Sequence, residues 1–231
     1  MKIKELVLFT DKLEDQKKFY VDLFGFKPSQ ESSDQFTIQV GHTRLVFRRT
    51  AIPQKYHYCF MVPSNKLQES IAWLKNRVEL IKDEAGNEIQ FSKSWNADAV
   101  YFYDGVGNVT KFIAHYDTIS QLKSARIKKK FDLKQILSVN EIGMAVKNIE
   151  NINERLENKC KSKLWSGNKN KSMANGGPEG RLILANKKFE KTWFPTKIKT
   201  DEAPFELIIE VDNKSYDLRY SNGELSSTAM L

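Results

Sequence analysis

The chain has 231 residues and a formal charge of +8 at pH 7, with 40% hydrophobic and 11% aromatic residues. A chain of this length forms one large domain or two small ones, and its aromatic content supports a sizeable core, which excludes disorder along most of the chain. No stretch approaches the roughly 20 consecutive apolar residues that a bilayer requires, and the N-terminus does not resemble a secretory signal. We therefore expect a cytoplasmic protein that makes no contact with membranes.

The first 48 residues predict a strand, a helix and two more strands. Strict alternation predicts the N-terminal strand, one face of which carries Ile3, Glu5, Val7 and Phe9. A helix is expected between Asp11, which can cap it, and Gly25, which ends it. Strands are expected at 36–40 and 43–48, joined through a glycine turn.

The same order of elements occurs again in the middle of the chain. An apolar strand is expected at 56–62, a helix begins at Ser64, and strands follow at 88–91, 99–103 and 109–115. A third copy begins with a strand at 138–146 and a helix at 148–156. Repetition of a strand, helix and strands indicates a fold built from repeated modules.

The remaining residues are less regular. We expect a strand at 181–186, a loop at 192–196 and a hairpin formed by 204–211 and 214–220. The loop contains Trp193, which either packs in a corner between strands or lines a ligand pocket. Residues 117–136 are rich in lysine and lack hydrophobic periodicity, so we expect a basic linker there.

Two motifs resemble the glyoxalase/bleomycin-resistance/ring-cleaving dioxygenase superfamily, also called the vicinal oxygen chelate superfamily. The first consists of the N-terminal strand followed by the Phe19-Tyr20 pair and Gly25-Phe26. The second, Tyr101-Phe-Tyr-Asp104 with Gly107-Asn108, resembles the closing turn of a module in that superfamily. The resemblance is clear over residues 1–116 and weaker over 137–220.

The resemblance implies an α+β fold of repeated βαβββ modules. We expect the first two modules, in a domain of residues 1–116, to form an open barrel around a cavity. Residues 117–136 are the linker, and residues 137–231 form a divergent, partial third module with C-terminal strands. In this superfamily the first and last strands of the modules supply the ligands of a divalent metal.

The resemblance also implies which residues line the cavity. Glu5 and His57 occupy corresponding inward positions on the first strands of two modules, and Glu141 occupies the same place in the third. The neighbouring inward residues are Val7, Phe9, Cys59 and Met61. Glu5 and His57 are the candidate metal ligands, and the last strand of the second module carries Lys111 where the family has a carboxylate.

Lys111 weakens the case for a metal. A lysine ammonium has three donors and no lone pair, so it cannot bind a metal ion. We predict that Lys111 faces the cavity near Glu5 and that the metal site is degenerate, with no cofactor required. As an alternative, burial turns Lys111 into a base or an anchor for an anion.

Three functions follow from these residues. The first is binding of a small molecule in a barrel cavity without metal. The second is a metal-dependent lyase or ring-cleaving dioxygenase that keeps Glu5 and His57 as ligands. The third is a basic binding protein for nucleic acid or another acidic partner, although the lysine-rich runs at 123–134 and 159–171 are more typical of solvated linkers.

The odd number of modules predicts an additional packing arrangement. The third module needs a partner for its concave face, which either the C-terminal hairpin or a second copy of the chain supplies. We expect a homodimer, because the hairpin is short for a whole sheet and two-fold symmetry is the commonest in soluble homo-oligomers.

Overall fold

A computed structural model describes residues 1–116 and 129–230. The first module contains β1 (Lys2–Thr10), α1 (Leu13–Lys17), the π-helical turn η1 (Lys18–Leu23), β2 (Pro28–Glu31), β3 (Gln35–Val40) and β4 (Thr43–Arg49). The second contains β5 (His57–Met61), η2 (Ser64–Lys66), α2 (Leu67–Lys75), β6 (Leu80–Ile81), β7 (Ile89–Ser92), η3 (Lys93–Trp95), β8 (Ala97–Tyr103) and β9 (Val109–His115).

The third module and the C-terminal strands complete the described chain. After η4 (Leu133–Gln135) come β10 (Ser138–Val146), α4 (Ile149–Cys160), β11 (Leu164–Asn168), β12 (Ser172–Gly177) and β13 (Gly180–Asn186). Asn148 caps α4, because its side-chain oxygen accepts a hydrogen bond from the backbone N–H of Asn151. The final strands are β14 (Phe205–Val211), β15 (Lys214–Ser221) and β16 (Glu224–Ala229).

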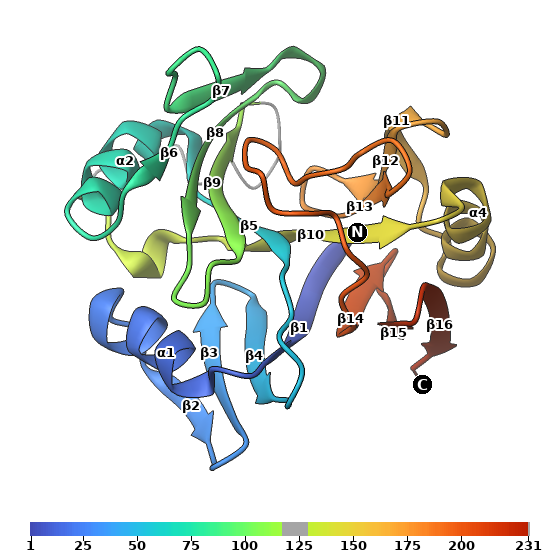
Figure 1. The fold of residues 1–231 in the computed structure, drawn as a ribbon, viewed down its shortest axis with the longest axis horizontal. Helices are drawn as coiled ribbons and strands as arrows, with labels where there is room; N and C mark the ends of the chain where they lie inside the picture. Colours follow the sequence, from blue (N-terminus) through green and yellow to red (C-terminus); the bar gives the residue numbers. More distant parts are fainter. Residues whose placement is uncertain (117–128, 231) are drawn as a thin grey trace.

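Within the described residues the strands form two sheets (Figure 1). The seven-stranded sheet has the order β16-β15-β14-β1-β4-β3-β2. The nine-stranded sheet has the order β11-β12-β13-β10-β5-β9-β8-β6, with β7 paired to β8. The α+β class with repeated βαβββ modules is therefore confirmed.

The modules pair differently from the prediction that the first two share one barrel. In the seven-stranded sheet β1 pairs antiparallel with β14, with Leu6 opposite Leu207. In the nine-stranded sheet β5 pairs antiparallel with β10, with Tyr58 opposite Ile142. The first module therefore joins the C-terminal strands, while the second joins the third. Local periodicity gave no information about this choice, because both pairings bury the same faces.

The two sheets share one hydrophobic core. Inward residues of the seven-stranded sheet, such as Leu6 and Phe47, belong to the same buried cluster as Phe60 and Phe112 of the nine-stranded sheet. Helices α1, α2 and α4 add their apolar faces to this cluster. The opposite face of the nine-stranded sheet carries a separate, smaller apolar cluster.

The two sequence motifs meet in this core. The Asp104 carboxylate accepts hydrogen bonds from the side chains of Gln16, Tyr58 and Asn108, at 2.6, 2.6 and 2.8 Å. The Tyr58 hydroxyl in turn contacts that of Tyr20. The closing turn of the second module is thus fastened to the helix of the first, so these motif residues are structural.

The third module is closed within the chain. Its β10 pairs with β5, and its concave face is covered in part by residues 187–204. Within the described residues, the third module therefore has no uncovered concave face of the kind that led us to expect a dimer. The predicted C-terminal hairpin (β14–β15) belongs to the seven-stranded sheet instead.

The predicted linker falls mostly on residues 117–128, which lie outside the described residues. Its end packs on the core, where Phe131 contacts Trp73 and Phe112. Among the described helices none is long and apolar enough to span a membrane.

Candidate functional site

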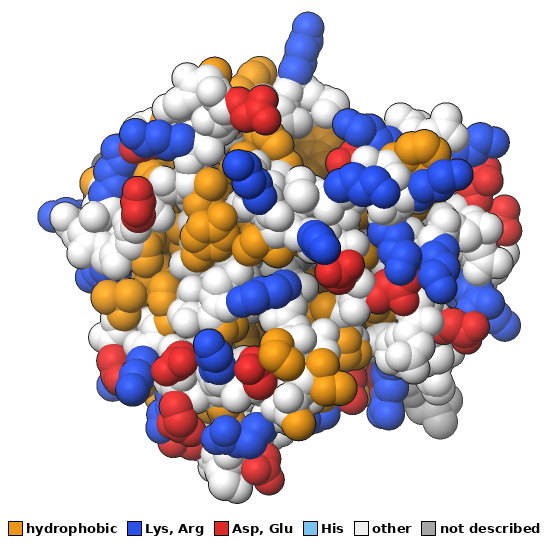
Figure 2. All heavy atoms as spheres, in the orientation of Figure 1, with side chains coloured by type: hydrophobic (Ala, Val, Ile, Leu, Met, Phe, Trp, Pro, Cys, Tyr) orange, Lys and Arg blue, Asp and Glu red, His pale blue; other side chains and the backbone are white. Residues whose placement is uncertain are grey.

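A cavity of about 440 Å³ lies on the outer face of the nine-stranded sheet. Its floor comes from β5, β8, β9, β10 and β13. It is covered by the segment 187–204 between β13 and β14, of which residues 190–200 supply the lining side chains. Figure 1 shows this connecting segment passing across the sheet between β8 and β12. In the space-filling view the surface is hollowed in this region and hydrophobic side chains line the hollow (Figure 2).

Trp193 fixes the cover to the sheet. Its indole is 5% exposed and packs against β10 at Gly143, where a Cβ would lie 2.6 Å from the Cη2 atom of Trp193. Its ring also lies 5.5 Å from that of His57. The covering segment is held by backbone hydrogen bonds from Trp193 N–H to Ile198 O and from Thr196 N–H to Trp193 O, both 2.8 Å. Trp193 therefore lines the pocket and also packs in a corner, combining the two predicted roles.

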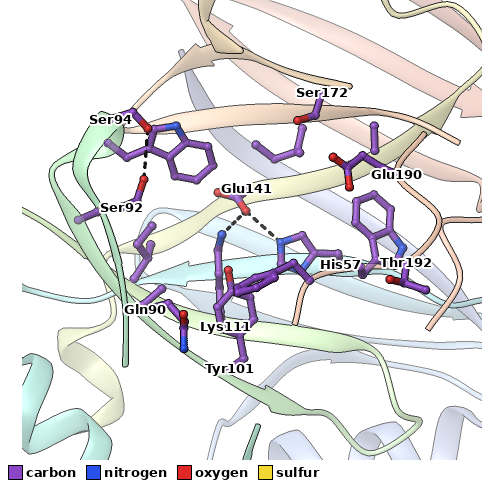
Figure 3. Close-up of a pocket in the computed structure, with 18 of the residues that line it drawn as sticks. His57, Gln90, Ser92, Ser94, Tyr101, Lys111, Glu141, Ser172, Glu190 and Thr192 are labelled. Carbon is purple, nitrogen blue, oxygen red and sulfur yellow. Dashed lines mark hydrogen bonds and ion pairs between the residues drawn. The ribbon is translucent and has the colours of Figure 1, made fainter. Parts of the chain in front are cut away.

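Charged side chains converge at the bottom of the cavity. Lys111 on β9 donates to Glu141 Oε1 on β10 at 2.6 Å, and His57 Nε2 on β5 lies 3.1 Å from the same oxygen. Figure 3 shows both side chains pointing at Glu141 from the neighbouring strands. Strand register explains the convergence, because Cys59 of β5 lies directly between Lys111 and Glu141 in one row across the sheet.

Arg181 extends this row on β13. It is paired in register with Glu141, and its Nε lies 3.5 Å from Glu141 Oε2. The guanidinium lies between two indole rings, 4.6 Å from Trp95 and 4.5 Å from Trp165. It also contacts Nε2 of His115 at the end of β9. A fully buried arginine is thus held by a carboxylate, an imidazole and two aromatic faces.

The surroundings fix the charges of this cluster. Burial alone raises the pKa of Glu141, but the positive charge of Lys111, with His57 and Arg181, outweighs it and lowers the pKa below the usual range. Burial alone lowers the pKa of Lys111, but Glu141 reverses this and raises it. Burial, with the charge of Arg181, lowers the pKa of His115 to about 4, so His115 is neutral at pH 7.

The structure brings together three of the predicted residues, His57, Lys111 and Glu141. The expected contact between Lys111 and Glu5 is wrong, because Glu5 belongs to the other sheet and pairs with Arg44 at 2.9 Å. Val7 and Phe9 also lie on that sheet, away from the cavity. Cys59 and Met61 are buried in the apolar cluster beneath the cavity, and burial raises the pKa of the Cys59 thiol well above its usual value.

Sequence reasoning missed Arg181 and His115. His115 stands at the end of β9, where a sequence pattern does not indicate burial, but it is fully buried. Arg181 followed a turn-rich segment that we did not align with the second module. Matching the last strand of the third module to β9 places Arg181 opposite Glu141, as Val109 lies opposite His57 in the second module.

The cluster does not fit the divalent metal that the resemblance implies. The first and last strands of the two modules supply His57, Lys111, Glu141 and Arg181, and neither an ammonium nor a guanidinium group has a lone pair to donate. The Lys111 ammonium also pairs with the Glu141 carboxylate and neutralises its negative charge. Among the described residues no group of three His, Cys, Asp or Glu side chains has the arrangement of a metal site.

A search of solved structures finds similar chains. A putative dioxygenase from Bacillus subtilis subsp. subtilis str. 168 superposes with a TM-score of 0.62 at 12% identity, over 99% of this chain and 84% of that one. A glyoxalase/bleomycin resistance protein/dioxygenase from Nocardioides matches 51% of this chain and 85% of its own, with a TM-score of 0.40 and 18% identity. A lactoylglutathione lyase from Agrobacterium tumefaciens matches 48% of this chain and 92% of its own, with a TM-score of 0.40 and 17% identity.

No protein-family model matches the sequence. A search of curated proteins also finds no match. The full-length superposition and the repeated βαβββ modules nevertheless give the chain the fold of the glyoxalase/bleomycin-resistance/dioxygenase superfamily, the vicinal oxygen chelate fold.

Proposed function

We propose that the protein binds a small molecule in the cavity between the second and third modules, with side-chain cations in place of a metal ion. The observation that supports this most directly is the Lys111 to Glu141 contact of 2.6 Å at the bottom of the cavity. The cavity volume of about 440 Å³ falls within the range of small-molecule sites. The metal-dependent lyase or dioxygenase is not favoured, because Lys111 stands where the superfamily has a metal-binding carboxylate and is paired with Glu141.

Metal analysis tests the absence of a metal ion. The purified protein is incubated with Zn²⁺, Fe²⁺, Mn²⁺ or Ni²⁺ and desalted, and bound metal per chain is measured by mass spectrometry. We expect far less than one ion per chain. Stoichiometric metal that is retained by the protein and lost in His57→Ala would contradict the proposal.

A pair of variants sharpens this test. Lys111→Glu places a second carboxylate beside His57 and Glu141 and should raise the affinity for Zn²⁺. The matched control Lys111→Met removes the same positive charge without adding a ligand, and its affinity should stay as low as that of the parent. Equal metal binding by the two variants would show that Lys111 does not occupy the metal position.

A cavity-filling variant tests small-molecule binding itself. Ala99 lines the cavity and is 6% exposed, so Ala99→Trp should fill the space and abolish thermal shifts that a compound library produces in the parent. Ala85 is exposed, so Ala85→Trp serves as the control. Thermal shifts that persist in folded Ala99→Trp would place binding elsewhere.

A further inference from the structure

The cluster at the bottom of the cavity carries more positive than negative charge. Lys111, which lines the cavity, and Arg181, which pairs with Glu141 from β13 and is not a lining residue, are both buried cations. Among the described residues, the one carboxylate within reach of both is Glu141. The other acidic residue that lines the cavity, Glu190, is already paired with Lys171 at 3.3 Å. A buried charge without a counter-charge is costly, so the cluster is one negative charge short.

Hydrogen-bond donors also outnumber acceptors in this cluster. His57 Nδ1 lies 3.0 Å from Val109 O and Nε2 lies 3.1 Å from Glu141 Oε1, so both ring nitrogens face groups that only accept. In the described part of the chain, Nε and Nη1 of Arg181 and Nε1 of Trp193 are buried donors without a hydrogen bond. Glu141 Oε2, which lies 3.5 Å from Arg181 Nε, is the buried acceptor of this cluster without one. Unsatisfied buried donors are uncommon in folded proteins and favour a ligand that brings acceptor oxygens.

The walls above this charged floor combine polar side chains, such as Ser92 and Thr192, with apolar and aromatic ones. Ile113, Ile183 and Trp193 line the interior. Two aromatic side chains stand at the opening, Phe91 on β7 and Phe194 on the covering segment, and they are 63% and 56% exposed. Large exposed aromatic side chains on both sides of a cavity are typical of a surface that contacts an apolar ligand.

We propose that the cavity selects an aromatic organic anion, whose carboxylate reaches Lys111 while its rings lie between the Phe91 and Phe194 sides of the opening. This inference rests on the proposed function, because it names the class of molecule that the cavity holds. The carboxylate supplies the missing negative charge and accepts a hydrogen bond from the Lys111 ammonium, because Glu141 and Tyr101 use only two of its three donors.

A pair of isosteric probes tests the inference. 2-Naphthoate and 2-naphthamide have the same rings and differ in charge, and their dissociation constants for the full-length protein are measured by isothermal titration calorimetry. We expect 2-naphthoate to bind at least about tenfold more tightly, which corresponds to about 1.4 kcal/mol. Equal affinities would overturn the charge selection but leave small-molecule binding intact.

Two lysine variants show which positive charge the bound anion contacts. Lys111→Met should weaken 2-naphthoate at least about tenfold and leave 2-naphthamide nearly unchanged, because only the anion uses the ammonium group. Lys191→Met removes one charge from the exposed side of the covering segment and should change neither affinity. If Lys191→Met weakens 2-naphthoate as much as Lys111→Met does, the anion binds the surface and the inference is wrong.

The remaining outcomes are also decisive. If Lys111→Met does not fold, the comparison of the two probes in the unmodified protein still tests charge selection. If neither probe binds at millimolar concentration, the inference about the ligand class is wrong. The library screen with Ala99→Trp then decides separately whether the cavity binds any small molecule.

Discussion

The indole ring of Trp193 packs directly against the backbone of Gly143. The indole of the covering segment occupies the space that any side chain on Gly143 would need, since an added Cβ would lie 2.6 Å from Trp193 Cη2 and 2.8 Å from Cζ3. Both atoms belong to a large buried ring, so a shift of the ring has to move the segment that carries it. The glycine on β10 therefore controls how closely residues 187–204 approach the sheet.

We predict that Gly143→Ala loosens this covering segment. The segment contains five lysines, at positions 187, 188, 191, 197 and 199, so displacement should expose sites for trypsin. Cleavage between residues 187 and 204 should become faster, as measured by mass spectrometry of a digestion time course. Gly177→Ala is the matched control, because a Cβ at Gly177 meets nothing within 4 Å. Identical cleavage of the two variants would show that Trp193 does not anchor the segment.

Loss of the Asp104 carboxylate should destabilise the whole fold. Asp104→Ala leaves the buried donors of Gln16, Tyr58 and Asn108 without their acceptor. We expect the free energy of unfolding to fall by about 3 to 5 kcal/mol, as for other broken buried networks. Urea denaturation measures it, and Asp34→Ala at an exposed turn should change it by less than about 0.5 kcal/mol. A small effect of Asp104→Ala would show that the motif does not fasten the modules.

His115 should make stability depend on pH below neutrality. Its pKa is about 4 in the folded protein against 6.5 normally, so the unfolded chain binds a proton first as pH falls. The contribution of His115 to stability is therefore complete above pH 6.5 and is lost between pH 6.5 and 4, by at most about 1.4 kcal/mol per pH unit.

The variant His115→Gln isolates this effect. Its side-chain oxygen can still accept from Arg181 but does not titrate. The difference in unfolding free energy between the parent and His115→Gln should change across pH 4 to 6.5 and stay constant above it. A constant difference across the whole range would mean that His115 titrates normally.

Arg181 should not be replaceable by lysine. The guanidinium lies between Trp95 and Trp165, and it contacts His115 and Glu141 at the same time. A lysine keeps the charge but has no planar group to fill this space. We expect Arg181→Lys to lower the unfolding free energy by more than about 2 kcal/mol, measured in urea. Arg44→Lys, at a half-exposed pair with Glu5, is the control and should have a much smaller effect.

Much of the fold was predictable from local pattern. Alternation placed Lys111 and Glu141 on the cavity-lining faces of their strands, because side chains alternate with a period of two. The motif around Asp104 marked the end of the second module. Alternation and the Asp104 motif both depend on residues that are close together in sequence. They therefore predict a strand or a turn, but not which strands lie beside it in the sheet.

The choice of strand neighbours could not be predicted in this way. Glu5 and Glu141 occupy equivalent positions in their modules, and nothing in the sequence around β5 indicates whether β1 or β10 lies beside it. The choice depends on burial summed over whole sheets, between residues far apart in the chain. The sequence predicted that Lys111 faces the cavity and pairs with a carboxylate. It named the wrong partner, because the carboxylate is that of Glu141 and not that of Glu5.

The pairing of β1 with β14 has a consequence for how the chain folds during synthesis. The N-terminal strand leaves the ribosome early, but the strand that covers its edge ends at Val211. Until then β1 presents unpaired backbone groups, which are a site for association with other chains. Nascent chains that stall before residue 205 should therefore depend on chaperones, and the β1–β4 sheet should acquire protease resistance only after the last strands have emerged.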